Sequence, residues 1–166
     1  MSVEAVPGLR ALAESYADAL HQHFGSRLIS VVLYGSVARG EATPVSDIDL
    51  LVVAELLPEG RQARNAILDE IDRSFLPVLA RLHRQKRYVD LSVLLFTLAE
   101  ARKLRPLYLD LVEDAILLYD RDHFFATILD QLRGRLEGLG ARRLQLGRLR
   151  YWDLKPDYRW GDRITV

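Results

Sequence analysis

Apolar and polar residues alternate along the chain in stretches that predict a sheet with helices packed on it. Runs that are rich in β-branched and apolar residues, as in buried strands, occupy residues 28–34, 47–54, 87–97 and 115–120. Apolar residues at spacings of three and four, as on one face of a helix, occupy residues 8–24, 63–79 and 122–138. We therefore expect an α/β chain of the α+β kind.

Shorter signals set the expected boundaries of these elements. Thr97 and Glu100 have the spacing of a capping box, so we expect a helix directly after the third strand and a further short one at 107–112. Pro77 predicts a kink or an end in the long helix that contains it. After Gly138 no clear period remains, and we predict an extended or irregular arm.

Composition limits the class of protein. The 166 residues fit one domain, which we place at 1–138, followed by a basic, aromatic tail at 139–166. The chain has no cysteine, which excludes disulfides and thiolate zinc sites and is typical of a reducing compartment. The N-terminus lacks a signal-peptide pattern, and no apolar run approaches the ~18–20 residues of a membrane span. We expect a cytoplasmic protein with no membrane contact.

Net charge is zero over the whole chain but is unevenly distributed. Residues 133–166 carry nine basic and four acidic side chains, against 14 basic and 19 acidic in the rest. A basic tail with arginine beside Trp152 and Trp160 suits base stacking in a nucleic acid, and it equally suits docking on its own domain or on another protein. Aspartates interrupt the positive charge, so we favour a protein interface, including self-association, over nucleic acid.

Two aspartates at the start of the second strand carry the first chemical signal. Asp47 and Asp49 point to one face of the strand, while Ile48 and Leu50 point to the other. Two ionised carboxylates ~6–7 Å apart repel each other unless a positive charge intervenes, and Mg²⁺ prefers such oxygen ligands. For an isolated pair we would favour the other interpretation, in which Asp47 caps the loop and Asp49 is the salt-bridge partner of an arginine.

A third carboxylate strengthens the metal interpretation. Asp90 falls within the predicted third strand and shares a face with Tyr88 and Ser92. If the second and third strands are neighbours, three carboxylates converge, which is enough for two metal ions ~3.5–4 Å apart and an in-line displacement at phosphorus.

The turn after the first strand predicts a phosphate site. Gly35 lets the backbone come close to a ligand, and N–H groups at a helix start attract phosphate. The Ser36 hydroxyl could bind a phosphate oxygen or cap the helix. Arg39 could neutralise triphosphate charge or be a solvated surface residue. In this order, the features describe a nucleoside triphosphate site.

At these residues the sequence resembles the minimal nucleotidyltransferases (MNT) of the DNA polymerase beta superfamily, prokaryotic branch. The stretches "LYGSVARG", "SDIDLLV" and "YVDLSV" carry the likeness, which covers about residues 10 to 120. It implies the nucleotidyltransferase fold, a small mixed sheet flanked by helices, and transfer of a nucleoside monophosphate with release of pyrophosphate. The family's acidic and Gly-Ser positions are all present.

The resemblance also implies roles for these residues. Gly35 and Ser36 would hold the triphosphate of the nucleotide, for which ATP is expected. Asp47 and Asp49 would ligate two Mg²⁺ ions, with Mn²⁺ as an alternative metal. Asp90 would complete one metal site and help to deprotonate the acceptor hydroxyl.

Many small members of this branch are antitoxins that add AMP to a helical HEPN-type toxin, and we expect such a partner protein here. Two alternatives stay open. One is a partner that acts by complex formation without catalysis. The other is a nucleotidyltransferase for a small molecule or RNA, completed by a partner subunit.

Overall fold

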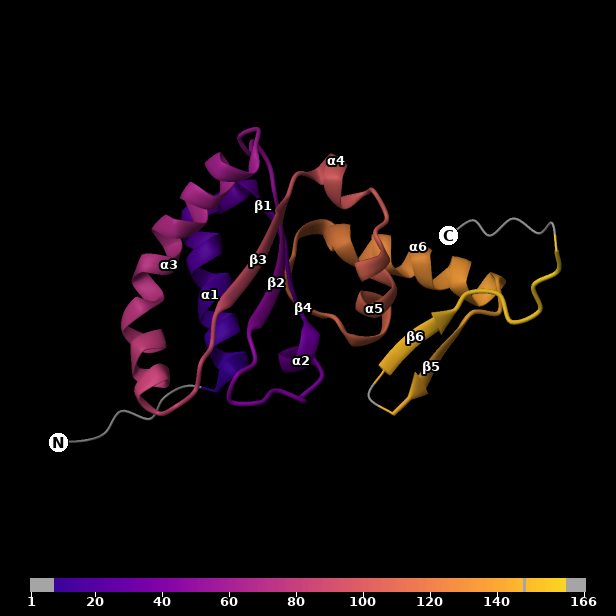
Figure 1. Ribbon diagram of the computed structural model, residues 1–166. Helices are drawn as coiled ribbons and strands as arrows, with labels where there is room; N and C mark the ends of the chain where they lie inside the picture. Colours follow the sequence, from indigo (N-terminus) through magenta and orange to yellow (C-terminus); the bar gives the residue numbers. More distant parts are fainter. Residues whose placement is uncertain (1–7, 148, 161–166) are drawn as a thin grey trace.

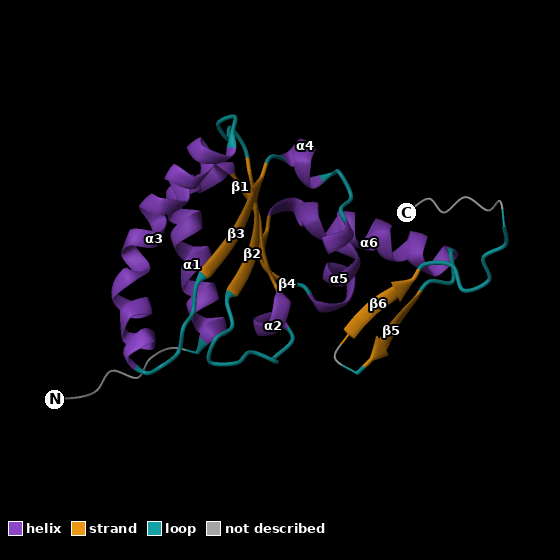
Figure 2. Cartoon of the chain, viewed as in Figure 1, coloured by secondary structure: helices purple, strands orange, loops and turns teal. Residues whose placement is uncertain are grey.

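The computed structural model describes residues 8–147 and 149–160 and centres on a four-stranded sheet. The strands lie in the order β3-β2-β1-β4, and only β2 and β3 are parallel, so the sheet is mixed as expected. Their bounds are β1 Leu28–Tyr34, β2 Ile48–Ala54, β3 Leu91–Phe96 and β4 Ile116–Asp120. Helices cover both faces of this sheet (Figures 1 and 2).

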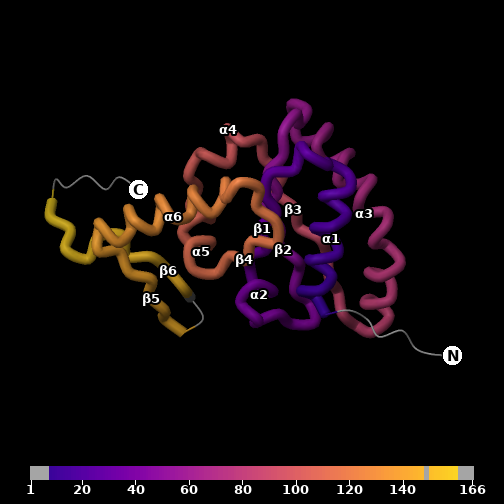
Figure 3. The backbone as a smooth tube through the Cα atoms, turned by 180° about the vertical axis from the view of Figure 1, so that it is seen from behind, coloured from indigo at the N-terminus to yellow at the C-terminus, as the bar shows by residue number. Residues whose placement is uncertain are grey.

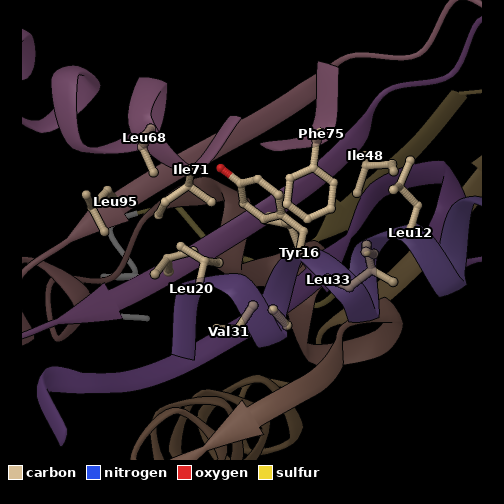
Figure 4. Close-up of a cluster of buried hydrophobic side chains, with 14 of the residues drawn as sticks. Leu12, Tyr16, Leu20, Val31, Leu33, Ile48, Leu68, Ile71, Phe75 and Leu95 are labelled. Carbon is tan, nitrogen blue, oxygen red and sulfur yellow. The ribbon is translucent and has the colours of Figure 1, made fainter. Parts of the chain in front are cut away.

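Two long helices, α1 (Leu9–Phe24) and α3 (Arg61–Arg84), cover one face. Their apolar stripes meet alternate residues of β1 and β2 in one continuous core cluster. Tyr16 stands at its centre, with its ring 5.0 Å from that of Phe75 (Figure 4). The Tyr16 hydroxyl donates to Asp72 at 2.7 Å, so this buried polar group has a partner.

Three shorter helices cover the other face. These are α4 (Leu98–Ala101), α5 (Pro106–Asp114) and α6 (Phe124–Gly138). A one-turn 3₁₀ helix, η2 (Arg121–His123), directly precedes α6. Their core side chains include Tyr108 and Phe125, which are fully buried and stack edge-on at 5.4 Å. The predicted capping box of Thr97 and Glu100 is present at the start of α4.

Two expected boundaries differ from the structure. Helix α3 does not end at Pro77 but runs through it, with Phe75 and Leu82 on either side both buried in the same core. The third strand begins at Leu91 rather than at residue 87. The preceding residues leave the ladder: Lys86 has a positive φ of 60°, and the Tyr88 N–H donates instead to the carbonyl of Pro44.

The chain after α6 forms a hairpin where no element was predicted. Strands β5 (Arg142–Leu146) and β6 (Leu149–Asp153) pair antiparallel, and their two-residue connection begins at Gly147 with a φ of +61°. The hairpin stands to one side of the sheet, near α5 and α6 (Figure 3). Trp152 and Leu154 pack against the core cluster of α5 and α6, so the arm is attached to its own domain.

No helix within the described ranges is long and apolar enough to cross a membrane.

Candidate functional site

The two predicted aspartates lie together at the end of the sheet that also carries the short helix α2 (Gly35–Ala38). Asp47 is the exposed residue just before β2, and Asp49 is the half-buried second residue of that strand. Ile48 between them is fully buried in the opposite core cluster. The apolar residue therefore anchors the strand in that cluster, while the Asp49 carboxylate lies beside Gly35.

Asp49 is flanked across the sheet by two hydroxyl residues. It pairs with Tyr34 of β1 and with Ser92 of β3. Burial and the charge of Asp47 raise the pKa of Asp49, while a hydrogen bond from Ser92 and the charge of Arg39 act in the opposite direction. Burial, together with the Asp49 charge, raises the pKa of Tyr34 to about 12, so this phenol stays neutral.

Asp90 lies at the same end of the sheet but outside a strand. It is exposed and directly precedes β3, and its carbonyl accepts a hydrogen bond from the Ile48 N–H at 2.9 Å. The prediction that it sits within the third strand is therefore corrected, whereas its placement on the neighbouring chain segment agrees with the parallel pairing of β2 and β3.

The glycine turn lies close against the carboxylate of Asp49. Gly35 begins α2 with a φ of +72°, in the left-handed region that favours glycine. A Cβ atom on Gly35 would collide with Oδ2 of Asp49 and lie 3.1 Å from its Cγ. The backbone thus passes directly over the Asp49 carboxylate, and only a residue without a side chain allows this.

The other two predicted nucleotide-binding residues lie on the same short helix or at its end. Ser36 is half-buried, and α2 takes no side-chain cap from the residues that the structure describes. Arg39 follows α2 and is engaged by carboxylates: its Nε donates to Glu41 at 2.8 Å, and its Nη1 lies 3.7 Å from Asp114. It is therefore not a freely solvated arginine.

The carboxylates of the site fit a divalent metal in the chemistry of their oxygen atoms and in their negative charge. Carboxylates are the ligands that Mg²⁺ prefers, and the repulsion between Asp47 and Asp49 is the kind that a bound cation relieves. Within the described ranges, however, no three acidic or histidine side chains lie close enough together to hold one ion. The assignment of Asp47, Asp49 and Asp90 as metal ligands stays a prediction.

Sequence reasoning did not identify the charged residues that surround Arg39. Arg143 of β5 donates to both carboxylate oxygens of Asp114, at 2.7 and 2.6 Å, and Arg150 of β6 pairs with Glu41. These pairs join positions far apart in the sequence and depend on a hairpin register that the sequence did not reveal.

The molecule also has a cavity at the other end of the sheet. It has a volume of about 500 Å³ and an apolar floor that includes Phe124 and Ile128, with Arg102, Arg121 and Arg135 around it. It lies beyond Arg121, whose side chain pairs with Glu55 directly after β2, and so it is remote from Asp47.

Comparison with known proteins gives a consistent result over most of the chain. The sequence profile of the family described as "Nucleotidyltransferase domain" matches residues 14–119. A relative from Methanocaldococcus jannaschii, named "Putative protein adenylyltransferase MJ1305", is 31% identical over 133 residues, which are 75% of this chain and 81% of the relative. A second protein of that organism, of the same name but numbered MJ0604, is 37% identical over 43 residues, 26% of this chain and 43% of the relative.

Solved structures match at lower identity. A toxin–antitoxin crystal structure with AMP-PNP aligns over 76% of this chain and 92% of its own, with 17% identity and a TM-score of 0.46. A complex of a tri-AMPylated HEPN toxin from Shewanella oneidensis with an MNT antitoxin aligns over 80% of this chain and 93% of its own, with 15% identity and a TM-score of 0.43.

Proposed function

The chain belongs to the nucleotidyltransferase domain family, and from this premise we propose that it transfers AMP from ATP to a hydroxyl group of a partner protein. The relative that is 31% identical bears the name of a protein adenylyltransferase, which supports both the nucleotide and the class of acceptor. We propose Asp47, Asp49 and Asp90 as the catalytic residues, and Gly35, Ser36 and Arg39 as the nucleotide-binding residues.

One observation carries the proposal: the Gly35 backbone passes directly over the Asp49 carboxylate. The turn proposed to hold the phosphates is thereby fixed against Asp49, so a phosphorus atom bound by α2 would lie next to a proposed catalytic carboxylate. Such fixed placement of reactants supplies a large part of the rate of a transfer reaction.

The residues have separate roles in the proposed reaction. The Gly35 and Ser36 N–H groups and the Ser36 hydroxyl hold phosphate oxygens, and Arg39 balances their negative charge. The acceptor hydroxyl attacks the α-phosphorus, its new O–P bond forms, and the bond from that phosphorus to the bridging oxygen breaks, which releases pyrophosphate. Asp90, exposed at the edge of the site, takes the proton of the acceptor hydroxyl.

Asp47, Asp49 and Asp90 would hold the metal in this proposal. A bound Mg²⁺ would neutralise charge on the phosphate oxygens and lower the pKa of the attacking hydroxyl. The carboxylates' own contribution is their placement: Asp49 is held by β2, between Tyr34 and Ser92, and Asp47 is held by the loop that enters the same strand.

A protein acceptor agrees with the name of the 31% identical relative, which is that of a protein adenylyltransferase. We propose a companion protein of the HEPN type, in keeping with the motif resemblance.

The test is transfer of labelled nucleotide to protein. Purified chain is incubated with a cell lysate, Mg²⁺ and each of the four nucleoside triphosphates labelled at the α-phosphate. We expect one labelled protein band, strongest with ATP, and loss of labelling when Mg²⁺ is chelated or in the Asp47→Ala/Asp49→Ala variant. The Asp69→Ala/Glu70→Ala variant is the matched control, because it removes two exposed carboxylates from α3.

Undiminished labelling in the Asp47→Ala/Asp49→Ala variant would contradict the proposed site. A partner that copurifies with this variant and is inhibited without modification would instead support action by complex formation.

A further inference from the structure

Arg39 is coupled to the hairpin through two shared carboxylates. Glu41 accepts from Arg39 Nε at 2.8 Å and from Arg150 Nη1 at 3.1 Å, both at the same oxygen, Oε2. Asp114 shows the same arrangement: its Oδ2 accepts from Arg143 at 2.6 Å and lies 3.7 Å from Arg39 Nη1. Each acidic group beside Arg39 is therefore also held by an arginine of the hairpin.

The hairpin arginines hold these carboxylates more completely than Arg39 does. Arg143 binds both oxygens of Asp114, and Arg150 binds both oxygens of Glu41, whereas Arg39 makes one hydrogen bond to Glu41 and a longer contact to Asp114. Two-point arginine–carboxylate pairs are stronger and better oriented than one-point contacts. Arg39 is thus the partner most easily withdrawn from the network.

The surroundings leave room for Arg39 to take another anion. A hollow of about 560 Å³ opens between α2, the end of α5 and the hairpin, and its walls include Arg39, Glu41, Arg143 and Arg150. A guanidinium that leaves Glu41 can therefore turn without displacing core side chains. The positive charge of Arg39 also acts to lower the pKa of Asp49, so Arg39 lies close enough to the acidic pair to interact with it electrostatically.

We propose that Arg143 and Arg150 are positioning residues: they hold Asp114 and Glu41, so that Arg39 exchanges these carboxylates for the phosphate groups of the nucleotide. This inference rests on the proposed nucleotide site and assigns a role in it to the hairpin, which lies outside the residues matched by the family profile. Glu41 competes with the nucleotide for Arg39, and Arg150 weakens that competition by binding Glu41 itself.

The first measurement needs no nucleotide. In wild type, Arg150→Gln and Glu41→Gln, hydrogen exchange at Nε of Arg39 is followed by NMR. We expect exchange to slow about threefold in Arg150→Gln, because Glu41 is left to Arg39 alone. In Glu41→Gln it should quicken about threefold, because Arg39 loses this partner. The factors are small because an exposed ion pair contributes little energy. Unchanged exchange in Arg150→Gln would overturn the proposal.

The second measurement is the dissociation constant of Mg·ATP for the same proteins. Arg150→Gln should weaken binding about threefold to fivefold, and Glu41→Gln should strengthen it by a similar factor. Arg142→Gln is the matched control, because this exposed arginine of β5 is outside the network, and its affinity should equal that of wild type.

The double variant Arg150→Gln/Glu41→Gln separates positioning from simple attachment of the hairpin. If Arg150 acts through Glu41, the double variant binds Mg·ATP at least as tightly as wild type. Weak binding by the double variant, or by Glu41→Gln alone, would overturn the proposal. If no variant, wild type included, bound Mg·ATP, the proposed function would be contradicted, and the exchange measurement would still decide whether the hairpin controls Arg39.

Discussion

Gly35 shows how a single residue fixes the relation between the two halves of the candidate site. Its positive φ and the Asp49 carboxylate beside its Cα both exclude a side chain. The sequence predicted a glycine turn for close approach to a ligand. The structure adds that the same glycine is required by a contact within the protein.

Gly35→Ala is expected to destabilise the fold by roughly 2–4 kcal/mol, because it adds a collision with Asp49 to the cost of a left-handed alanine. Gly40→Ala is the matched control: Gly40 has a φ of +70° but no atom within 4 Å of its would-be Cβ, so it should lose only about 1 kcal/mol. Urea denaturation of both variants measures the difference. Equal losses would show that the Asp49 contact is not decisive.

The sequence identified the Asp47–Asp49 pair but not the neighbours of Asp49. Alternation along one strand is enough to place both carboxylates on one face. Which residues of β1 and β3 stand beside Asp49 depends on strand order and register. The placement of Tyr34 and Ser92 on either side of it was therefore not predictable from alternation alone.

At the scale of elements, buried runs were predictable and exposed ones were not. All four strands of the main sheet were predicted, because their continuous apolar residues fill a core between two helical layers. The hairpin was missed because its strands carry arginine and glutamine among the apolar residues. Its available signal was the two-residue connection beginning at Gly147, between two five-residue runs.

The hairpin's attachment through Asp114 should depend on pH. Hydrogen bonds from Arg143, with added attraction from the Arg39 and Arg150 charges, lower the pKa of Asp114 below its ordinary value near ~3.9. A carboxyl whose folded-state pKa is lowered stabilises the fold above the unfolded-state pKa, and this stabilisation is lost as pH falls through the folded-state value.

Asp114→Asn should therefore be less stable than wild type by about 1–2 kcal/mol near neutral pH, and the difference should shrink as pH falls below ~4. Urea denaturation of both proteins at neutral pH and at about pH 3 measures this. A difference that is as large at about pH 3 as at neutral pH would contradict the ionic role of Asp114.

At the scale of the whole molecule, the basic tail and the acidic body partly neutralise each other. The sequence left open whether the tail meets nucleic acid, another protein or its own domain. In the structure, Arg143 and Arg150 of the hairpin face Asp114 and Glu41 of the body. The phosphate groups of a nucleic acid would therefore have to compete with Asp114 and Glu41 for these two arginines.

Binding to single-stranded RNA should accordingly be weak in wild type and depend little on salt. Glu41→Gln/Asp114→Asn releases Arg39, Arg143 and Arg150, and it should steepen the dependence of log affinity on log salt by up to about three phosphate contacts. Fluorescence anisotropy at several salt concentrations gives both slopes. A steep slope already present in wild type would favour nucleic acid as a natural partner.

We propose that the acidic pair beside the Gly35 turn directs transfer of a nucleoside monophosphate. The most direct test compares ATP labelled at the α-phosphate with ATP labelled at the γ-phosphate, using the purified chain, Mg²⁺ and its acceptor protein. We predict that the α label appears on the acceptor, that the γ label appears in pyrophosphate, and that Asp47→Ala/Asp49→Ala abolishes both. Transfer of the γ label to the acceptor would show transfer of a phosphoryl group and contradict transfer of a nucleoside monophosphate.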